Sequence, residues 1–332
     1  MDKNKPIDIV ITWVDGNDPV HRKKRNEYSE SKIRHEDIDG ETRFVSVGEI
    51  AYCIASINRF ASFVRKIFIV TDQQDPGIAP DGPLTSWLKE NFEQPIPMEI
   101  IDHKVIFEGY EQYLPTFNSL SIETLLWKIP GLSDDFVYFN DDVILIGETS
   151  PETWFKDGKT NVYGYWHKRW TAALLRALRL KKHGHKEFTF RDSLLNGADV
   201  AGAKKNFFRL THTPHAMNRS LLETFYNAHP EVILRNISHR FRDAHQFNPQ
   251  AMFQNFAIAQ GQANILSTSG LIFYMRPREE ENYMQECIRR CEAISTAKFL
   301  CVNSLDQANE IDRQLMLSWI ASRIGVKDTY KA

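Results

Sequence analysis

Three consecutive polar residues, Asn140, Asp141 and Asp142, interrupt an apolar stretch of the chain. Residues 136–139 before them and 143–146 after them are apolar and β-leaning, so the polar side chains stand where a buried strand ends. Polar groups at such a position are costly unless they are used. Adjacent carboxylates are hard oxygen ligands that suit Mg²⁺ or Mn²⁺ bridging a phosphate. We therefore predict a metal and phosphate site at Asp141 and Asp142; the alternative is a tight turn between two hairpin strands.

A second polar loop follows the first predicted strand. Residues 7–13 are β-branched and apolar, and the loop after them contains Asp15, Asp18 and Pro19. Loops at the carboxyl ends of strands are where nucleotide-binding folds contact a phosphate or ribose. Asp18 and Pro19 suit the cap and the first position of the next helix. Asp15 is not needed for that cap, so we predict a functional role for it; a plain strand-to-helix turn is the alternative.

Two further clusters lie in the C-terminal half. His212 and His215 are three residues apart, just before a predicted helix. Such a pair can supply a base, a metal ligand or phosphate contacts near a helix start, whereas a lone histidine is more often structural. Arg240 and Arg242 form a compact basic group before another predicted helix. Guanidinium groups bind phosphate through two hydrogen bonds, and surface ion pairing is the alternative.

A strongly basic segment spans residues 167–191. It carries eight Lys or Arg residues against one acid, Glu187, together with leucines and tryptophans. A basic helix with Leu and Trp on its other face resembles a helix that lies in a membrane interface. The alternative is an amphipathic helix that packs on the protein and turns its cations toward an anionic substrate.

The elements that position these clusters follow from the apolar patterning. Predicted strands alternate with helices, and a β-α-β-α-β-α-β order predicts an α/β fold with a mainly parallel sheet and flanking helices. The strands are predicted at residues 7–13, 66–71, 98–101, 136–139 and 143–146. The helices are predicted at residues 21–34, 47–60, 84–91, 119–129, 218–226, 249–260 and 305–324. Residues 153–165 are predicted as short, mixed structure.

This pattern divides the chain into three parts. We predict an α/β core at residues 1–160 and a basic amphipathic insertion at residues 161–205. A helical part at residues 206–332 is predicted to complete the active site.

Composition excludes several classes of protein. The 41 basic and 43 acidic residues leave no excess positive charge, so we expect no binding to nucleic acid. There is no run of about 18 apolar residues, and the N-terminus lacks the apolar core of a signal peptide. We therefore predict a cytoplasmic protein, which the basic segment could attach to the inner face of the cell membrane. The four cysteines include no CxxC pair, which predicts reduced, buried thiols rather than a zinc site.

Taken together, these motifs resemble the Stealth family. That family comprises hexose-1-phosphate transferases of capsular and cell-wall polysaccharide synthesis and includes the lysosomal-enzyme N-acetylglucosamine-1-phosphotransferase. Its first conserved region resembles residues 8–19. Its second resembles Arg43-Phe44 with the helix that follows, and then residues 64–72, 114–119 and 139–142. The third resembles residues 212–215 with 240–242, and the fourth resembles residues 301–303.

The chain departs from the family pattern at two places. The family's helix after Arg43-Phe44 usually carries an arginine where this chain has Ala55. The fourth region usually shows Asn-Asp, where this chain has Asn303-Ser304. From the resemblance we therefore assign no role to Ala55 or to Asn303.

The resemblance implies an enzyme whose sheet binds a nucleotide-diphosphate sugar. Such an enzyme transfers a hexose-1-phosphate, for example N-acetylhexosamine-1-phosphate from a UDP-sugar, to a hydroxyl of a glycan acceptor and releases UMP. A lipid-linked acceptor would explain the basic segment. Two alternatives remain open: a metal-dependent glycosyltransferase that releases UDP, and a non-catalytic subunit of a polysaccharide assembly machine.

The resemblance also implies roles for single residues. Asp141 and Asp142 would hold Mg²⁺ or Mn²⁺ against the diphosphate. His212 or His215 would accept the proton of the acceptor hydroxyl. Phosphoryl transfer mostly requires positioning and neutralisation of spread negative charge. The remaining predicted contacts to nucleotide, phosphate or sugar are Asp15, Arg43, Asn118, Asn140, Arg240 and Arg242.

Overall fold

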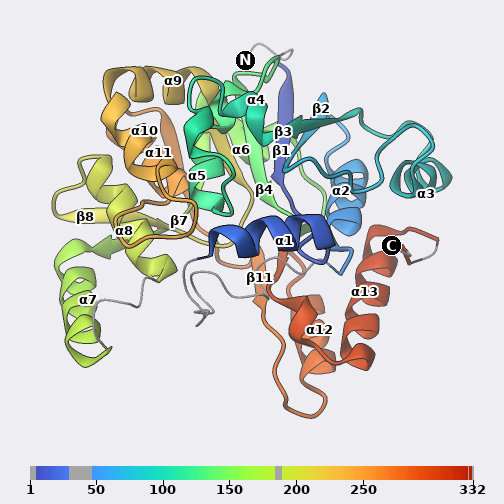
Figure 1. The fold of residues 1–332 in the computed structure, drawn as a ribbon. Helices are drawn as coiled ribbons and strands as arrows, with labels where there is room; N and C mark the ends of the chain where they lie inside the picture. The colour runs from blue at the N-terminus through green and yellow to red at the C-terminus, as the bar shows by residue number, and fades with distance from the viewer. Residues whose placement is uncertain (1–4, 30–46, 184–188, 328, 331–332) are drawn as a thin grey trace.

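A five-stranded sheet forms the centre of the computed structural model, which describes residues 5–29, 47–183, 189–327 and 329–330 (Figure 1). The strand order is β3-β2-β1-β4-β9; β1 to β4 run parallel, and β9 lies antiparallel beside β4. The register places Thr12 beside Asn140, so two strand ends meet at one edge of the sheet. The strands are β1 (Ile7–Thr12), β2 (Lys66–Thr71), β3 (Met98–Asp102), β4 (Asp135–Asn140) and β9 (His215–Asn218).

Both faces of this sheet are buried, because successive side chains of a strand point to opposite faces. Ile9 and Ile11 of β1 join one apolar cluster with α2 and α13. Val10, between them, joins a second cluster with α5, α9, α10 and α11. Asp8, also buried in β1, forms an ion pair of 2.5 Å with Arg65. Helices therefore cover the sheet on both sides.

The helices vary from single turns to four turns. They are α1 (Pro19–Tyr28), α2 (Glu49–Phe60), α3 (Pro83–Asn91), α4 (His103–Ile106), α5 (Ser119–Thr124), α6 (Pro151–Trp154), α7 (Arg169–His183), α8 (Phe190–Val200), α9 (Arg219–Ala228), α10 (Pro230–Ile237), α11 (Pro249–Ala259), α12 (Tyr283–Glu292) and α13 (Glu310–Ile324). Short 3₁₀ turns lie at Glu111–Tyr113, Leu126–Lys128 and Leu305–Gln307. In the described ranges no helix is both long and apolar enough to span a lipid bilayer.

Two smaller sheets flank the central one. The first has the order β10-β7-β6, and β8 pairs with the later part of β7. The second has the order β11-β12-β5, and β5 directly follows Asp141 and Asp142. Their strands are β5 (Val143–Leu145), β6 (Phe155–Lys156), β7 (Lys159–Lys168), β8 (Asn206–Leu210), β10 (Ala263–Leu266), β11 (Ile272–Met275) and β12 (Phe299–Val302).

The structure confirms the predicted α/β class and the predicted strands of the parallel sheet. Three local predictions were wrong. Residues 159–168 form the long strand β7, so the basic segment enters its helix only at Arg169. The helix predicted at residues 119–129 ends at Thr124, whose hydroxyl bonds back to the Leu120 carbonyl. The part predicted as helical, residues 206–332, also contributes strands β8 to β11. The four cysteines are buried free thiols.

Candidate active site

A cavity of about 640 Å³ opens beside the carboxyl ends of β1 and β4. Thr12 and Asn140, the last residues of these strands, both line it. This is the edge at which open α/β sheets bind ligands. The structure brings seven of the ten predicted site residues to its wall: Asn118, Asn140, Asp141, Asp142, His212, His215 and Arg242.

Three carboxylates lie on one side of the cavity: Glu49 is buried, and Asp141 and Asp142 are half-buried. Asp141 and Asp142 form the turn between β4 and β5, and Glu49, the first residue of α2, lies near them. Burial raises the pKa of Asp141 well above its ordinary value, and the charges of Asp142 and Glu49 raise it further. Burial likewise raises the pKa of Asp142 to about 6 and that of Glu49 to about 7. Charging this acidic cluster without a cation is therefore unfavourable.

The hydrogen bonding of Asp142 leaves room for a cation. Its Oδ2 accepts from Asn303 Nδ2 at 3.4 Å and from the Cys301 thiol at 3.7 Å. Its Oδ1 is buried and has no hydrogen-bond partner among the described residues. No group of three or more His, Cys, Asp or Glu side chains in the described part of the chain forms a complete metal cage. One or two carboxylates completed by substrate phosphate and water are what Mg²⁺ prefers, so these residues fit that ion.

A hydrogen-bond network centred on the Tyr138 hydroxyl positions the residues at the carboxyl end of β4. The Tyr138 hydroxyl lies 2.7 Å from Asn140 Oδ1, 2.9 Å from Thr12 Oγ1 and 3.1 Å from Glu123 Oε1. Burial raises the pKa of Glu123, which the neighbouring Arg242 partly opposes. One phenolic proton cannot serve two acceptors, so a protonated Glu123 would satisfy the network. Asn140 is therefore held in place by Tyr138.

The two histidines enter the cavity from β9 and from the loop before it. His215 begins β9 opposite Tyr138, and its Nδ1 lies 3.3 Å from Gln254 Nε2. Burial lowers the pKa of His215 to about 3. The His212 ring lies between Phe190 and Tyr274, with ring centroids 5.3 and 4.8 Å away. Burial and the charge of Arg209 lower the pKa of His212. Both rings are neutral near pH 7, as a proton acceptor must be.

Asn118 holds the loop that carries Arg242. Its Oδ1 accepts from the Leu120 amide at 3.2 Å and so caps α5. Its Nδ2 donates to the carbonyls of His239 at 3.0 Å and Phe241 at 2.8 Å, and to Gln246 Oε1 at 2.8 Å. These partners use its donor capacity, so the structure favours positioning over direct substrate contact. Arg242 in turn lines the cavity and donates to Ser119 Oγ at 2.9 Å.

Two predicted residues that the structure describes, Asp15 and Arg240, do not line the cavity. The Asp15 carboxylate accepts from the Asn17 amide at 2.8 Å in a turn, and the neighbouring Val14 lines the cavity instead. Asp18 caps α1 as predicted. The Arg240 guanidinium lies over the Tyr28 ring, 4.9 Å from its centroid, and donates to the Leu114 carbonyl at 3.4 Å. Direct roles for Asp15 and Arg240 thus lack geometric support. Arg43 lies outside the described residues.

Sequence reasoning missed several residues that line the cavity. Glu49 and Glu123 each stand in an otherwise apolar helix, and an acid inside an apolar helical stripe was the available signal. Tyr274 and Phe190 gave no signal, because they come from elements far apart in the chain. Asn303, assigned no role from the sequence, contacts Asp142.

Comparison with known proteins agrees with the motif order. Stealth protein CR1, conserved region 1, matches residues 5–33, and Stealth protein CR2, conserved region 2, matches residues 43–163. A capsular polysaccharide phosphotransferase of Actinobacillus pleuropneumoniae is 30% identical over 313 residues, covering 88% of this chain and 79% of that protein. An exopolysaccharide phosphotransferase of Streptomyces coelicolor is 34% identical over 253 residues, covering 72% of this chain and 37% of that protein. The chain thus spans less than half of this Streptomyces relative.

Among solved structures, the apo form of the bifunctional glycosyltransferase WbbM shares the fold. The match has a TM-score of 0.52 at 9% identity and covers 97% of this chain and 50% of that one. At this identity the likeness concerns the fold alone.

Proposed function

The chain belongs to the Stealth family, and from that premise we propose that it transfers a hexose-1-phosphate from a nucleotide sugar to a hydroxyl of a glycan acceptor. Capsular or cell-wall polysaccharide synthesis would be the setting, with a UDP-sugar as donor and UMP as the leaving product. The observation that carries the proposal is the shared cavity, which is lined by two neutral histidines, by Arg242 and by the adjacent carboxylates of Asp141 and Asp142.

In the proposed reaction the acceptor hydroxyl oxygen attacks the phosphorus attached to the sugar. A new oxygen–phosphorus bond forms, and the bond between that phosphorus and the bridging oxygen of UMP breaks. His212 or His215 takes the hydroxyl proton, since both imidazoles are neutral. Arg242 donates to the phosphoryl oxygens, where negative charge spreads in the transition state.

A divalent cation held by Asp141 and Asp142 would neutralise the diphosphate and stabilise the leaving group. Two features of the chain favour this assignment. One is the buried Asp142 Oδ1 without a hydrogen-bond partner among the described residues, and the other is the raised pKa of three neighbouring carboxyl groups. Glu123, beside Arg242, is proposed to orient that guanidinium.

The nucleotide product separates this proposal from its alternatives. The protein is incubated with UDP-N-acetylhexosamines, Mg²⁺ and a capsular oligosaccharide, and the nucleotides are separated by ion-exchange chromatography. Acceptor-dependent UMP, with a phosphodiester signal in the ³¹P spectrum of the glycan, is expected. UDP and a glycoside product would instead identify a glycosyltransferase. Absence of either nucleotide across a panel of UDP-sugars would favour a non-catalytic subunit.

Matched variants test the site in the same assay. Asp142→Asn is expected to lower turnover by at least about a hundredfold, because the charge that holds the cation is lost. Asp157→Asn, an exposed acid in the turn between β6 and β7, should leave turnover unchanged. Equal turnover of the two variants would contradict the role given to Asp142.

A further inference from the structure

The helix α7 exposes large apolar side chains and turns arginines toward the protein, which is the reverse of an ordinary surface helix. Apolar residues of a helix normally face the protein. Here Trp170, Leu174, Leu175 and Leu178 are 63%, 50%, 62% and 56% exposed. Trp170, Leu174 and Leu178 follow one another at intervals of four residues, so they form one stripe, and Leu175 adjoins it. We call these four residues the outer face of α7.

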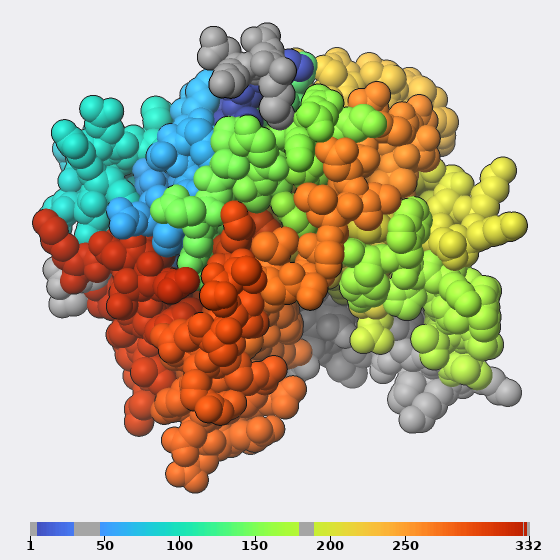
Figure 2. Space-filling model, turned by 180° about the vertical axis from the view of Figure 1, so that it is seen from behind, coloured from blue at the N-terminus to red at the C-terminus, as the bar shows by residue number. Residues whose placement is uncertain are grey.

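The inward side of α7 is held by arginines instead. Arg169 Nε pairs with Asp199 at 2.8 Å, and its backbone amide donates to the Lys205 carbonyl at 3.1 Å. Arg176 donates to Asn196 at 3.0 Å and lies 3.6 Å from Asp192. These contacts fix the orientation of α7 against α8, so the outer face cannot turn inward without breaking them. Figure 1 shows α7 projecting away from the central sheet, and Figure 2 shows the same segment at one edge of the molecule from behind.

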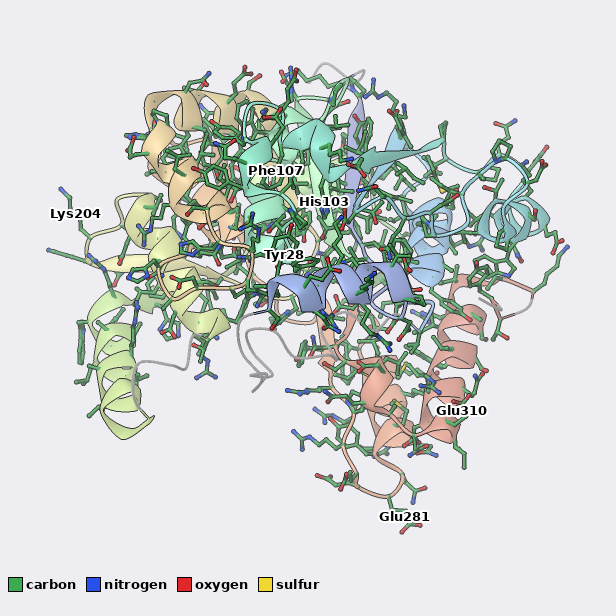
Figure 3. The ribbon with its side chains drawn as sticks, in the orientation of Figure 1. Tyr28, His103, Phe107, Lys204, Glu281 and Glu310 are labelled. Carbon is green, nitrogen blue, oxygen red and sulfur yellow. The ribbon has the colours of Figure 1, made fainter. Side chains whose placement is uncertain are left out.

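Positive charge lies beside the start of α7. Lys168, at the end of β7, is exposed, and so are Lys204 and Lys205 in the loop that contacts the start of α7. Figure 3 shows Lys204 pointing outward from this edge. Within the described ranges, none of these lysines forms an ion pair, whereas Asp192 and Asp199 are engaged by the inward arginines. The surface therefore combines apolar anchors with excess positive charge.

We propose that the outer face of α7 docks on an anionic phospholipid surface. Leucine and tryptophan side chains enter the boundary between headgroups and acyl chains, and adjacent lysines contact lipid phosphates. The helix has 15 residues, about 22 Å at 1.5 Å per residue, so it lies along the surface and does not cross it.

The test is co-sedimentation of the full chain with vesicles, without donor or acceptor, so its outcome is independent of the proposed reaction. Binding to phosphatidylcholine vesicles with about 30% phosphatidylglycerol is expected, and much weaker binding to pure phosphatidylcholine. The double variant Leu174→Gln/Leu178→Gln should lower the partition coefficient about tenfold or more. Its matched control is Ile311→Gln on α13, where the wild-type side chain is 79% exposed, and that control should bind as wild type.

Two further measurements keep the proposal falsifiable. Lys204→Glu/Lys205→Glu should weaken binding to the anionic vesicles and leave thermal stability unchanged, since both side chains are exposed. Brominated lipids should quench wild-type fluorescence more than that of Trp170→Phe. Unchanged vesicle binding by the leucine variant would overturn the proposal. A wild-type dimer that the same variant dissociates, without vesicle binding, would assign the outer face to a second copy of the chain.

Discussion

At the scale of single residues, the carboxylates beside β4 and the two histidines are tuned in opposite directions by the same cause. Burial favours the uncharged form of each group. It therefore raises the pKa of Asp142 to about 6 and lowers the pKa of His215 to about 3. Near pH 7 both imidazoles are therefore neutral, whereas Asp142, with a pKa of about 6, is mostly ionised and can attract a cation.

The first prediction concerns the stability of Asp142→Asn. The folded pKa of Asp142 is raised above its ordinary value of 3.8, so its contribution to stability is fully present below pH 3.8 and is lost as the pH rises through about 6. At pH 8, without metal, the free energy of unfolding of the variant should therefore be about 1 to 3 kcal/mol higher than that of wild type. Urea unfolding at pH 5 and pH 8 measures this difference. A destabilised variant at pH 8 would contradict the electrostatic account.

A second prediction separates the two histidines. Arg209 lowers the pKa of His212, while its charge is not among the causes of the low pKa of His215. If His212 is the base, Arg209→Gln should raise its pKa and move the acid limb of the kcat/KM profile to higher pH. An acid limb that stays in place would favour His215. Lys205→Gln serves as the control. Lys205 is an exposed cation immediately before β8, the strand that contains Arg209, and its substitution should leave the profile unchanged.

At the scale of elements, the site depends on loops fixed by a few buried amides. Asn118 joins α5 to the segment that contains Arg242, and Asn236 and Gln246 extend this network through the same region. Because the donors and acceptors are buried, each must be satisfied within the protein. The loop conformation therefore behaves as part of the core, although no regular secondary structure holds it.

The third prediction follows from this network. Asn118→Ala removes a helix cap and the buried hydrogen bonds to the Arg242 loop, so it should lower the free energy of unfolding by about 2 to 4 kcal/mol. Turnover should also fall at temperatures where the variant is folded, because Arg242 loses its support. Asn309→Ala is the matched control, since Asn309 caps α13 by accepting from Asp312 and does not line the cavity. It should cost about 1 kcal/mol and leave turnover unchanged.

The elements also show which features the sequence could predict. β1, β2 and β4 are runs of β-branched and aromatic residues between polar loops, so their pattern alone predicted buried parallel strands. β7 was missed because its pattern is irregular. Gly164 interrupts it, and a Cβ at that position would lie 2.2 Å from the Arg209 carbonyl oxygen of β8. Such an approach depends on a partner strand about 45 residues later, which local patterning does not reveal.

The residues of the candidate site likewise include some that the sequence could predict and some that it could not. The residues at strand ends, Asn140 to Asp142, were predictable because strand direction fixes where a carboxyl end lies. The sequence marks Glu49 and Glu123 only as acids within apolar helices, and their place in the cavity depends on helices packed from both sides of the sheet. The partners of Asn118 lie about 120 to 130 residues away, so its positioning role emerged only from the tertiary contacts.

At the scale of the whole molecule, metal binding and stability should be linked. Charged carboxylates around Asp142 cost free energy, and a cation bound only by the folded state would recover it. Ionisation of the carboxylates in the cavity and binding of a cation there should both change the stability of the fold. The properties of the cavity are therefore expected to appear in global unfolding as well as in turnover.

The fourth prediction is a thermal shift that depends on pH. Mg²⁺ or Mn²⁺ should raise the melting temperature more at pH 8 than at pH 5.5, because below about pH 6 to 7 the ion must displace protons from Asp142 and Glu49. At a concentration one hundred times Kd, the stabilisation should be about 2.7 kcal/mol. A chelator should reverse the shift. An equal shift in Asp141→Asn/Asp142→Asn would place the ion elsewhere.

The antiparallel strand β9 has a consequence for how the protein is made. A ribosome completes the acidic turn at Asp142 long before it reaches His215, and Asn303 and β12 follow later still. A nascent chain that ends between Asp142 and His212 would contain the carboxylates but lack both histidines, Arg242 and strand β12, which pairs with β5. Under the proposed mechanism, catalysis requires most of the polypeptide to be synthesised first, and chains that end before residue 212 should show no turnover of sugar nucleotides.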